Sequence, residues 1–431
     1  MNKILKFQLI FFVIICVFSI NLFAIENSEN SESVAVERFA LYVAANNGGK
    51  EREVLRYAAS DAEKLKNTMQ EIGGIDNKNS VILTEPNQVE VEKALQDFAE
   101  KVNSAKKSAR RTEFIFYYSG HSDENALLLG EESYGYSQLK SAINSVPSDV
   151  HVVMLDSCFS GNFIRAKGGT RQKSFLVDES SIVSGHAYLS SSSESEASQE
   201  SDLIQSSFFT HALITGLRGA ADSSGDNKVS LNELYHYAFN ETLSQTEQST
   251  IGTQHPSYDI TLVGSGDLVL SDISTAESIL VLNSDLQGKI YIRNEDTKIL
   301  VSEIKKSAGN SIPLALPSGN YKVTMIQENQ TLEANAKLKS GRSVSLVAKK
   351  FKKVDTTDTR TRGGTFIPKE QPSSQENNDI YKDLPDSESA DKFFDLNDDM
   401  NDIRNNAMDA IKKALGKMGS ESGDGNGSGS G

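Results

Sequence analysis

The sequence predicts a largely parallel α/β sheet flanked by helices, followed by a small all-β sandwich domain and a disordered tail. The first observation is a series of nearly continuous apolar runs that alternate with segments of helical period between Glu37 and Leu270. Strands that are covered on both faces have this composition. The second observation is a change near Ala276 to short alternating runs with Gly, Asn and Pro turns, which is typical of a sandwich.

The individual elements follow from these runs. Strands are expected at 39–45, 80–84, 113–119, 151–157 and 187–191, and helices near 56–72, 88–106, 137–145 and 207–219. The α/β domain is expected to span 37–270 and the sandwich 276–350. Residues 351–431 form an acidic, Gly- and Ser-rich tail with too few apolar residues for a core, except for an expected amphipathic helix at 390–418.

The first 24 residues have a basic start, an apolar core and a small last residue, which predicts a signal peptide that ends at Ala24. A polar linker, 25–36, follows it. No second long apolar run occurs in the sequence, so we expect an exported protein, periplasmic or extracellular, without a transmembrane anchor after signal removal. The net charge of -15 argues against a nucleic-acid-binding surface.

Removal of the signal takes Cys16 with it and leaves Cys158 as the single cysteine, which excludes an internal disulfide framework. Cys158 is then either a small buried apolar side chain or a reactive thiol. It follows the apolar run 151–157, and His121 follows the run 113–119. Because the carboxyl ends of parallel strands share one edge of a sheet, these two side chains are expected to meet there.

A thiol needs a base before it becomes a strong nucleophile, and His121 would serve as that base and later return the proton to a leaving amine. Backbone N–H groups in the turn after Cys158 would bind a developing oxyanion. Asp156 disfavours a thiolate beside it, so it suits a site whose substrate carries a positive charge. The alternative is that Asp156 caps N–H groups of the following turn.

The motifs YYSGH, 117–121, and DSCFSG, 156–161, resemble those of caspase-like cysteine peptidases, specifically the metacaspase and paracaspase branch. The resemblance covers about 37–263. It implies a caspase-like fold, protein or peptide substrates, a catalytic dyad of His121 and Cys158, and no cofactor for the chemistry. It also implies an oxyanion hole formed by the backbone N–H groups of Ser122 and Cys158.

The same resemblance implies that Asp156 and Asp61 bind an Arg or Lys at P1, although Asp61 also fits a plain position on a helix surface. Two residues depart from the family pattern. Ser122 stands where the family usually has Gly, and Phe159 stands where it usually has His. An endopeptidase and a catalytically silent scaffold, which binds a surface partner through the sandwich and tail, therefore both remain open.

Two further segments carry predictions. The stretch 222–233 fits the spacing of an EF-hand calcium loop, with a ligand set of Asp222, Ser224, Asp226, Lys228, Ser230 and Glu233. A plain turn into a helix is the alternative for this stretch. The loop after Cys158 carries four basic residues that a peptidase with basic preference would cut in its own chain, unless the loop is an ordinary basic surface: Arg165, Lys167, Arg171 and Lys173.

Overall fold

The structure is a computed structural model that describes residues 36–165, 184–193, 196–247, 249, 251–264, 267–328 and 330–354. All of these residues belong to one compact unit. The predicted signal peptide, all of the linker except its last residue, and the tail from residue 355 with its expected helix lie outside the described residues.

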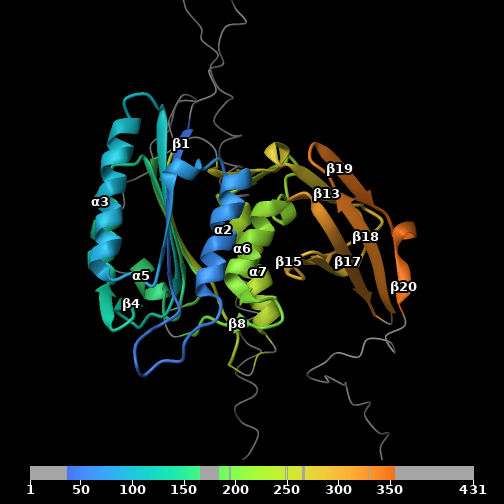
Figure 1. Cartoon of the computed structure of the whole chain (residues 1–431), viewed down its shortest axis with the longest axis horizontal. Coiled ribbons are helices and arrows are strands. Elements are labelled where there is room, and N and C mark those ends of the chain that lie inside the picture. The colour runs from blue at the N-terminus through green and yellow to red at the C-terminus, as the bar shows by residue number, and fades with distance from the viewer. Residues whose placement is uncertain are drawn as a thin grey trace, which may run out of the picture. The chain divides into compact units, whose positions relative to one another are not determined.

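A six-stranded sheet forms the centre of the α/β part, in the order β11-β7-β6-β3-β1-β2 (Figure 1). Its strands are β1 (Val36–Ala45), β2 (Ser80–Thr84), β3 (Arg111–Gly120), β6 (Val150–Asp156), β7 (Ser184–Ser190) and β11 (Ser257–Val263). Five are parallel, and β11 pairs antiparallel with β7 at the edge. The predicted largely parallel sheet is confirmed. β11 was not predicted from the sequence, because this edge strand is only half covered and lacks a continuous apolar run.

Helices cover both faces of this sheet (Figure 1). One face carries α3 (Gln88–Ala105), α4 (Tyr136–Asn144) and α5 (Gly161–Arg165), and the other carries α2 (Ala58–Ile72), α6 (Phe208–Thr215) and α7 (Leu231–Thr246). Successive side chains in a strand point to opposite faces. Leu41 accordingly packs in the core on the α3 side, whereas Tyr42 packs in the core on the α2 side. The sheet is therefore buried on both faces, as its apolar runs predict.

Short hairpins lie between these elements. They are formed by β4 (Ala126–Leu129) with β5 (Glu132–Gly135), and by β8 (Glu200–Ser201) with β9 (Ser206–Ser207). A further antiparallel pair joins β10 (Lys228–Ser230) to β12 (Val269–Asp272). The β4–β5 hairpin follows His121 and the β8–β9 hairpin precedes α6, so both contribute to the sheet edge described below.

The region after β12 consists of two sheets that share one apolar core. The three-stranded sheet has β16 (Ile312–Leu316), β13 (Ser278–Leu282) and β19 (Arg342–Leu346), and the five-stranded sheet has β15 (Leu300–Lys306), β14 (Gly288–Asn294), β17 (Gly319–Gln327), β18 (Gln330–Leu338) and β20 (Lys352–Val354). All pairings are antiparallel except that of β13 with β19. The predicted all-β region is thereby confirmed.

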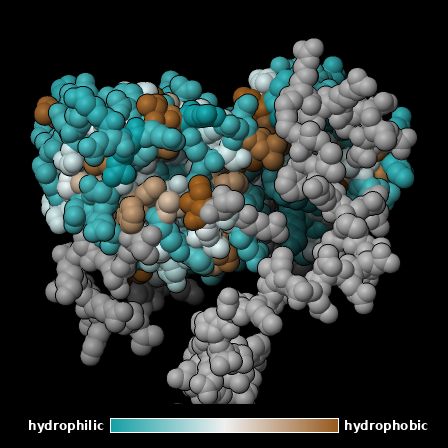
Figure 2. All heavy atoms as spheres, turned by 90° about the horizontal axis from the view of Figure 1, so that it is seen from below, coloured by the Kyte–Doolittle hydropathy of each residue, from teal (hydrophilic) through white to brown (hydrophobic). Residues whose placement is uncertain are grey.

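The surface of the described part is mainly polar in the view of Figure 2, where hydrophobic residues form small separate groups. Exposed apolar side chains include Leu203 at the turn of the β8–β9 hairpin. Among the helices of the described ranges, none is long and apolar enough to cross a membrane.

Candidate active site

Cys158 and His121 lie at the same edge of the sheet. Strands β3 and β6 are parallel neighbours in which Ser119 is paired with Asp156, and His121 and Cys158 each follow two residues later. A side chain joins the two segments, because the hydroxyl of Ser122 donates a hydrogen bond to the main-chain carbonyl oxygen of Cys158. The structure therefore places His121 and Cys158 at the same edge of the sheet, just beyond the carboxyl ends of neighbouring strands.

The imidazole of His121 is held by the loop between β1 and α2. Its Nε2 atom lies 2.7 Å from the carbonyl oxygen of Glu53. A carbonyl can only accept a hydrogen bond, so Nε2 carries the proton and the neutral ring keeps Nδ1 free as a base. Burial lowers the pKa of His121, and this effect outweighs the opposing effect of the Glu53 hydrogen bond. The ring is therefore neutral, and ready to accept a proton, at near-neutral pH.

Gly48 fixes the position of the ring from the same loop. A Cβ atom on this residue would lie 2.5 Å from both Cγ and Cδ2 of His121, which is closer than atoms can pack. The buried hydroxyl of Tyr118 donates to the His121 carbonyl oxygen at 2.6 Å and anchors the main chain of this residue. The imidazole thus packs closely against a glycine and extends from an anchored main chain.

The thiol of Cys158 is partly buried, and burial raises its pKa. The nearby Asp156 carboxylate also raises it, whereas a hydrogen bond from the Ser198 backbone N–H and the charge of Arg52 lower it. The free thiol is therefore protonated at neutral pH. A nucleophilic role requires the neutral His121 to remove its proton.

A tight turn follows the nucleophile candidate. Phe159 has a φ of 52°, a left-handed conformation that is costly for a bulky residue. Its N–H donates to the carbonyl oxygen of Glu196 at 3.0 Å, which holds the turn in place. β6 ends at Asp156, one residue before the predicted end. Ser198 contacts both Asp156 and Cys158, since its hydroxyl donates to Asp156 at 2.7 Å and its backbone N–H donates to the Cys158 sulfur.

Ser122 is fully buried, and its side chain is directed at the Cys158 carbonyl oxygen. The residues on either side of Ser122 make main-chain hydrogen bonds to the hairpin. The Leu128 N–H donates to the carbonyl oxygen of His121 at 2.9 Å, and the Asp123 N–H donates to the carbonyl oxygen of Ala126 at 3.0 Å. Ser122 lies opposite Leu127, between these two hydrogen bonds. This is a non-hydrogen-bonded position of the antiparallel pair, so the N–H of Ser122 points away from the strand that carries Leu127. The structure therefore accommodates a side chain where the family has glycine.

Asp156 is 3% exposed and accepts hydrogen bonds from three side-chain hydroxyls. The hydrogen bonds from Ser198 and Thr210 are 2.7 Å and 2.5 Å long, and the third hydrogen bond comes from Ser207. These donors belong to the segment before β8 and to the start of α6, not to the turn after Cys158. Among the described residues, the Asp156 carboxylate therefore accepts from these hydroxyls and does not cap N–H groups of the turn after Cys158.

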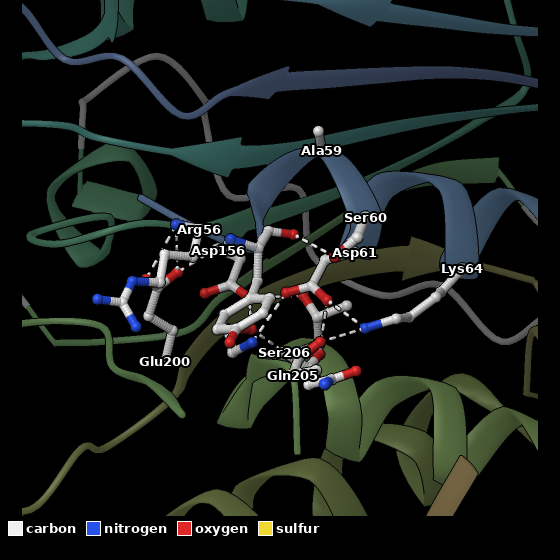
Figure 3. A network of polar contacts seen from close by, with 12 residues as sticks. Arg56, Ala59, Ser60, Asp61, Lys64, Asp156, Glu200, Gln205 and Ser206 are labelled. Atoms are coloured by element: carbon white, nitrogen blue, oxygen red, sulfur yellow. Dashed lines mark hydrogen bonds and ion pairs between the residues drawn. The ribbon is translucent and has the colours of Figure 1, made fainter. Parts of the chain in front are cut away.

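Asp61 lies in the first turn of α2 and is 0% exposed, so the helix-surface alternative is wrong (Figure 3). It accepts hydrogen bonds from the Ser206 hydroxyl at 2.6 Å and the Ser207 N–H at 2.8 Å, and Lys64 lies 3.2 Å away. Because Ser207 also donates to Asp156, one residue bridges the two carboxylates. Burial, together with the smaller effect of the nearby Asp156 charge, raises the pKa of Asp61 to about 7.

The segment 222–233 forms a turn into α7 in which the carboxylates bind the main chain. Asp222 accepts from the N–H groups of Gly225, Asp226 and Asn227, and Glu233 accepts from those of Ser224 and Ser230. Asn227, in the position of the usual glycine, has the left-handed φ of 65° that the calcium-loop pattern predicts. In the described part of the chain, His, Cys, Asp and Glu side chains do not gather into a group that could hold a metal ion.

Three of the four basic residues of the predicted self-cleavage loop, Lys167, Arg171 and Lys173, lie outside the described residues, and Arg165 is the last residue of α5. Sequence reasoning also missed several groups at this edge. Gly48, the Glu53 carbonyl, Ser198, Ser207 and Thr210 all contact the predicted site residues. Only Ser207 had a local signal, as a serine at the N-cap of a predicted helix.

The protein is thus an α/β protein in which a cysteine and a histidine follow neighbouring strands at one edge of the sheet, and in which Asp156, two residues before the cysteine, is joined through Ser207 to a second buried carboxylate. Residues 37–264, more than half of the chain, match the family described as caspase domain, peptidase C14. The chain belongs to this family, which makes it a caspase-like cysteine peptidase by descent. Caspase-1 from Spodoptera frugiperda is similar, with 13% identity and a TM-score of 0.40 over 55% of this chain and 91% of that one. No curated protein matches the sequence.

Proposed function

We propose that this protein is an exported cysteine endopeptidase that uses Cys158 and His121 to cleave peptide bonds after Arg or Lys. The observation that carries the proposal is the buried pair of carboxylates, Asp156 and Asp61, which Ser207 joins and of which Asp156 lies close enough to the half-buried thiol to raise its pKa. Three of their four oxygens accept from side-chain hydroxyls, which can rotate and release lone pairs to an entering cation.

In the proposed reaction, Nδ1 of His121 removes the thiol proton, and the sulfur of Cys158 attacks the carbonyl carbon of the scissile bond. The carbonyl π electrons move to oxygen and form an oxyanion, which the backbone N–H groups of Ser122 and Cys158 would stabilise. Collapse of this intermediate breaks the C–N bond, and His121 donates the proton to the leaving amine. Water then attacks the thioester carbonyl while His121 takes up one of its protons. The C–S bond breaks, the acyl fragment leaves as a carboxylic acid, and the proton returns from His121 to the sulfur.

The carboxylate pair supplies the proposed specificity. Two buried carboxylates repel one another and are poorly hydrated, so a guanidinium or ammonium that reaches them gains a strong, weakly screened attraction. An acidic P1 side chain would add a third negative charge at the same place. The charges therefore favour Arg and Lys and disfavour Asp at P1.

The direct test uses the purified mature protein with fluorogenic peptides that differ only in P1: Arg, Lys and Asp. Each peptide is assayed with calcium and with a chelator, and Cys158 is labelled in parallel with an electrophile. Turnover of the Arg and Lys peptides alone would support the proposal, and loss of turnover in chelator would indicate that calcium binding contributes to activity. No turnover of any peptide and no labelling of Cys158 would favour the scaffold alternative.

Gly48→Ala is expected to lower kcat roughly 100-fold, because the added methyl group must displace the His121 ring and misplaced catalytic groups lose about this factor. KM for the Arg peptide should change little. The matched control is Gly135→Ala, since a Cβ on Gly135 meets no atom within 4 Å. Activity of Gly48→Ala within twofold of this control would contradict the expectation.

Ser122→Gly restores the usual family residue and is nevertheless expected to lower kcat about fivefold. It removes the hydrogen bond to the Cys158 carbonyl oxygen, and one such bond contributes about 1 kcal/mol. Ser122→Ala, which lacks the hydroxyl but keeps Cβ, should behave similarly. A rise in kcat for the glycine variant would instead mean that the serine side chain obstructs the oxyanion hole.

A further inference from the structure

The loop 46–57 contacts both halves of the candidate site. Near its middle, the Glu53 carbonyl accepts from His121, as described above. Three residues later, Arg56 forms two hydrogen bonds from Nη1 to the carboxylate of Asp202, at 2.7 Å and 2.9 Å. The hydroxyl of Tyr57 donates to the same carboxylate at 2.6 Å.

Asp202 lies in the β8–β9 hairpin, which also holds the carboxylate pair. Two of its residues, Ser206 and Ser207, donate to Asp61 and Asp156. Glu200 at its start accepts from the Arg56 N–H at 3.0 Å (Figure 3). One side of the hairpin thus binds the proposed P1 pocket, and the other side binds the loop that orients the imidazole.

We infer that Arg56 and Asp202 are a positioning pair that couples the hairpin at the P1 pocket to the imidazole of His121. The link runs from Asp202 through the Arg56 side chain to the Glu53 carbonyl, three residues away along the chain. Because both ends are fixed by hydrogen bonds, a shift of the hairpin on substrate binding would move the carbonyl that orients the ring. This inference rests on the proposed peptidase function.

Because Arg56 and Asp202 are exposed, their effect on the position of His121 can be measured apart from any effect on folding stability. The side chains of Arg56 and Asp202 are 67% and 68% exposed, and ion pairs that are this exposed contribute little to stability. Loss of the pair should therefore leave the melting temperature unchanged. A suitable control is the ion pair of Lys78 and Asp76, which is similarly exposed at 73% and 70% and does not belong to the site.

The test compares Arg56→Ala, Asp202→Ala and the double variant with Lys78→Ala, using an Arg-P1 peptide. Each single variant should lose roughly tenfold or more in kcat at nearly constant KM, as expected for a displaced base. The double variant should lose no more than the singles, since coupled residues are not additive. The exchanged pair, Arg56→Asp with Asp202→Arg, should recover part of the activity.

A second readout needs no turnover and therefore separates this inference from the proposed function. Burial is the larger influence on the pKa of His121, and Arg52, Glu200 and Glu85 are the charged groups that act on it. If the loop retreats, the pKa should rise toward its ordinary value, which an NMR titration of His121 detects. In a chain that cleaves nothing, this shift would still support the coupling.

Three outcomes would overturn the inference. The first is that Arg56→Ala and Asp202→Ala have the same kcat and the same His121 pKa as Lys78→Ala. Another is losses that multiply to about a hundredfold in the double variant, as independent sites do. The last is a change in KM alone, which would make Asp202 a contact for substrate.

Discussion

Cys158→Ala is expected to abolish hydrolysis of Arg and Lys peptides, with a loss on the order of 10⁶-fold as in other peptidases that lose their nucleophile. The chain folds around this residue without depending on it, because the thiol is only half-buried and the turn is held by the Phe159 N–H. The melting temperature should change little. Peptide hydrolysis by wild type and variant, purified in parallel, measures the effect.

The same pair of proteins tests self-cleavage. Wild-type protein should be cut after one of the basic residues from Arg165 to Lys173, and Cys158→Ala should stay intact, which mass spectrometry of the fragments can show. Wild type that hydrolyses peptides while its own loop stays uncut would contradict self-processing but not the peptidase function. Appreciable turnover by Cys158→Ala would mean that another nucleophile, or a contaminant, is responsible.

Asp156→Asn is expected to reduce kcat/KM for Arg and Lys peptides by roughly 30- to 5000-fold. Loss of one partner of a buried charge pair costs about 2–5 kcal/mol, and each 1.4 kcal/mol is tenfold. Asparagine has nearly the same shape, and its carbonyl oxygen can still accept from the hydroxyls on one side while its NH2 group donates to a hydroxyl on the other, so the fold should persist. A matched Ser198→Ala variant, which removes only one hydroxyl donor, should lose far less. Equal losses would point to a purely structural role for Asp156.

Asp61 adds a pH dependence to this pocket. Its pKa is raised to about 7 by burial, so the free enzyme binds a proton there as the pH falls below that value. A cationic P1 side chain favours the ionised carboxylate and must therefore expel the proton. KM for Arg peptides should rise up to about tenfold per pH unit below pH 7, and Asp61→Asn should remove this slope. A slope that persists in the variant would assign it to another group.

Sequence patterns predicted the sheet well because its central strands are covered on both faces and leave continuous apolar runs. The edge of the sheet carrying His121 and Cys158 could be predicted for the same reason, since both follow such runs. The contacts that orient them could not, because they depend on main-chain groups. The Glu53 carbonyl has no residue-specific signal, and the role of Gly48 follows only from its distance to the imidazole. Hydroxyl donors such as Thr210 come from distant segments that folding brings together.

Ser207 has a consequence for any change of specificity. It caps α6 by accepting from the Thr210 N–H at 3.0 Å while it donates to Asp156 and binds Asp61 through its own N–H. The start of α6 and the proposed P1 pocket are thus joined through Ser207 in one hydrogen-bond network. A redesign for neutral or acidic P1 residues would have to replace the carboxylates and their hydroxyl donors together, and recap the helix, since any single exchange leaves buried groups without partners.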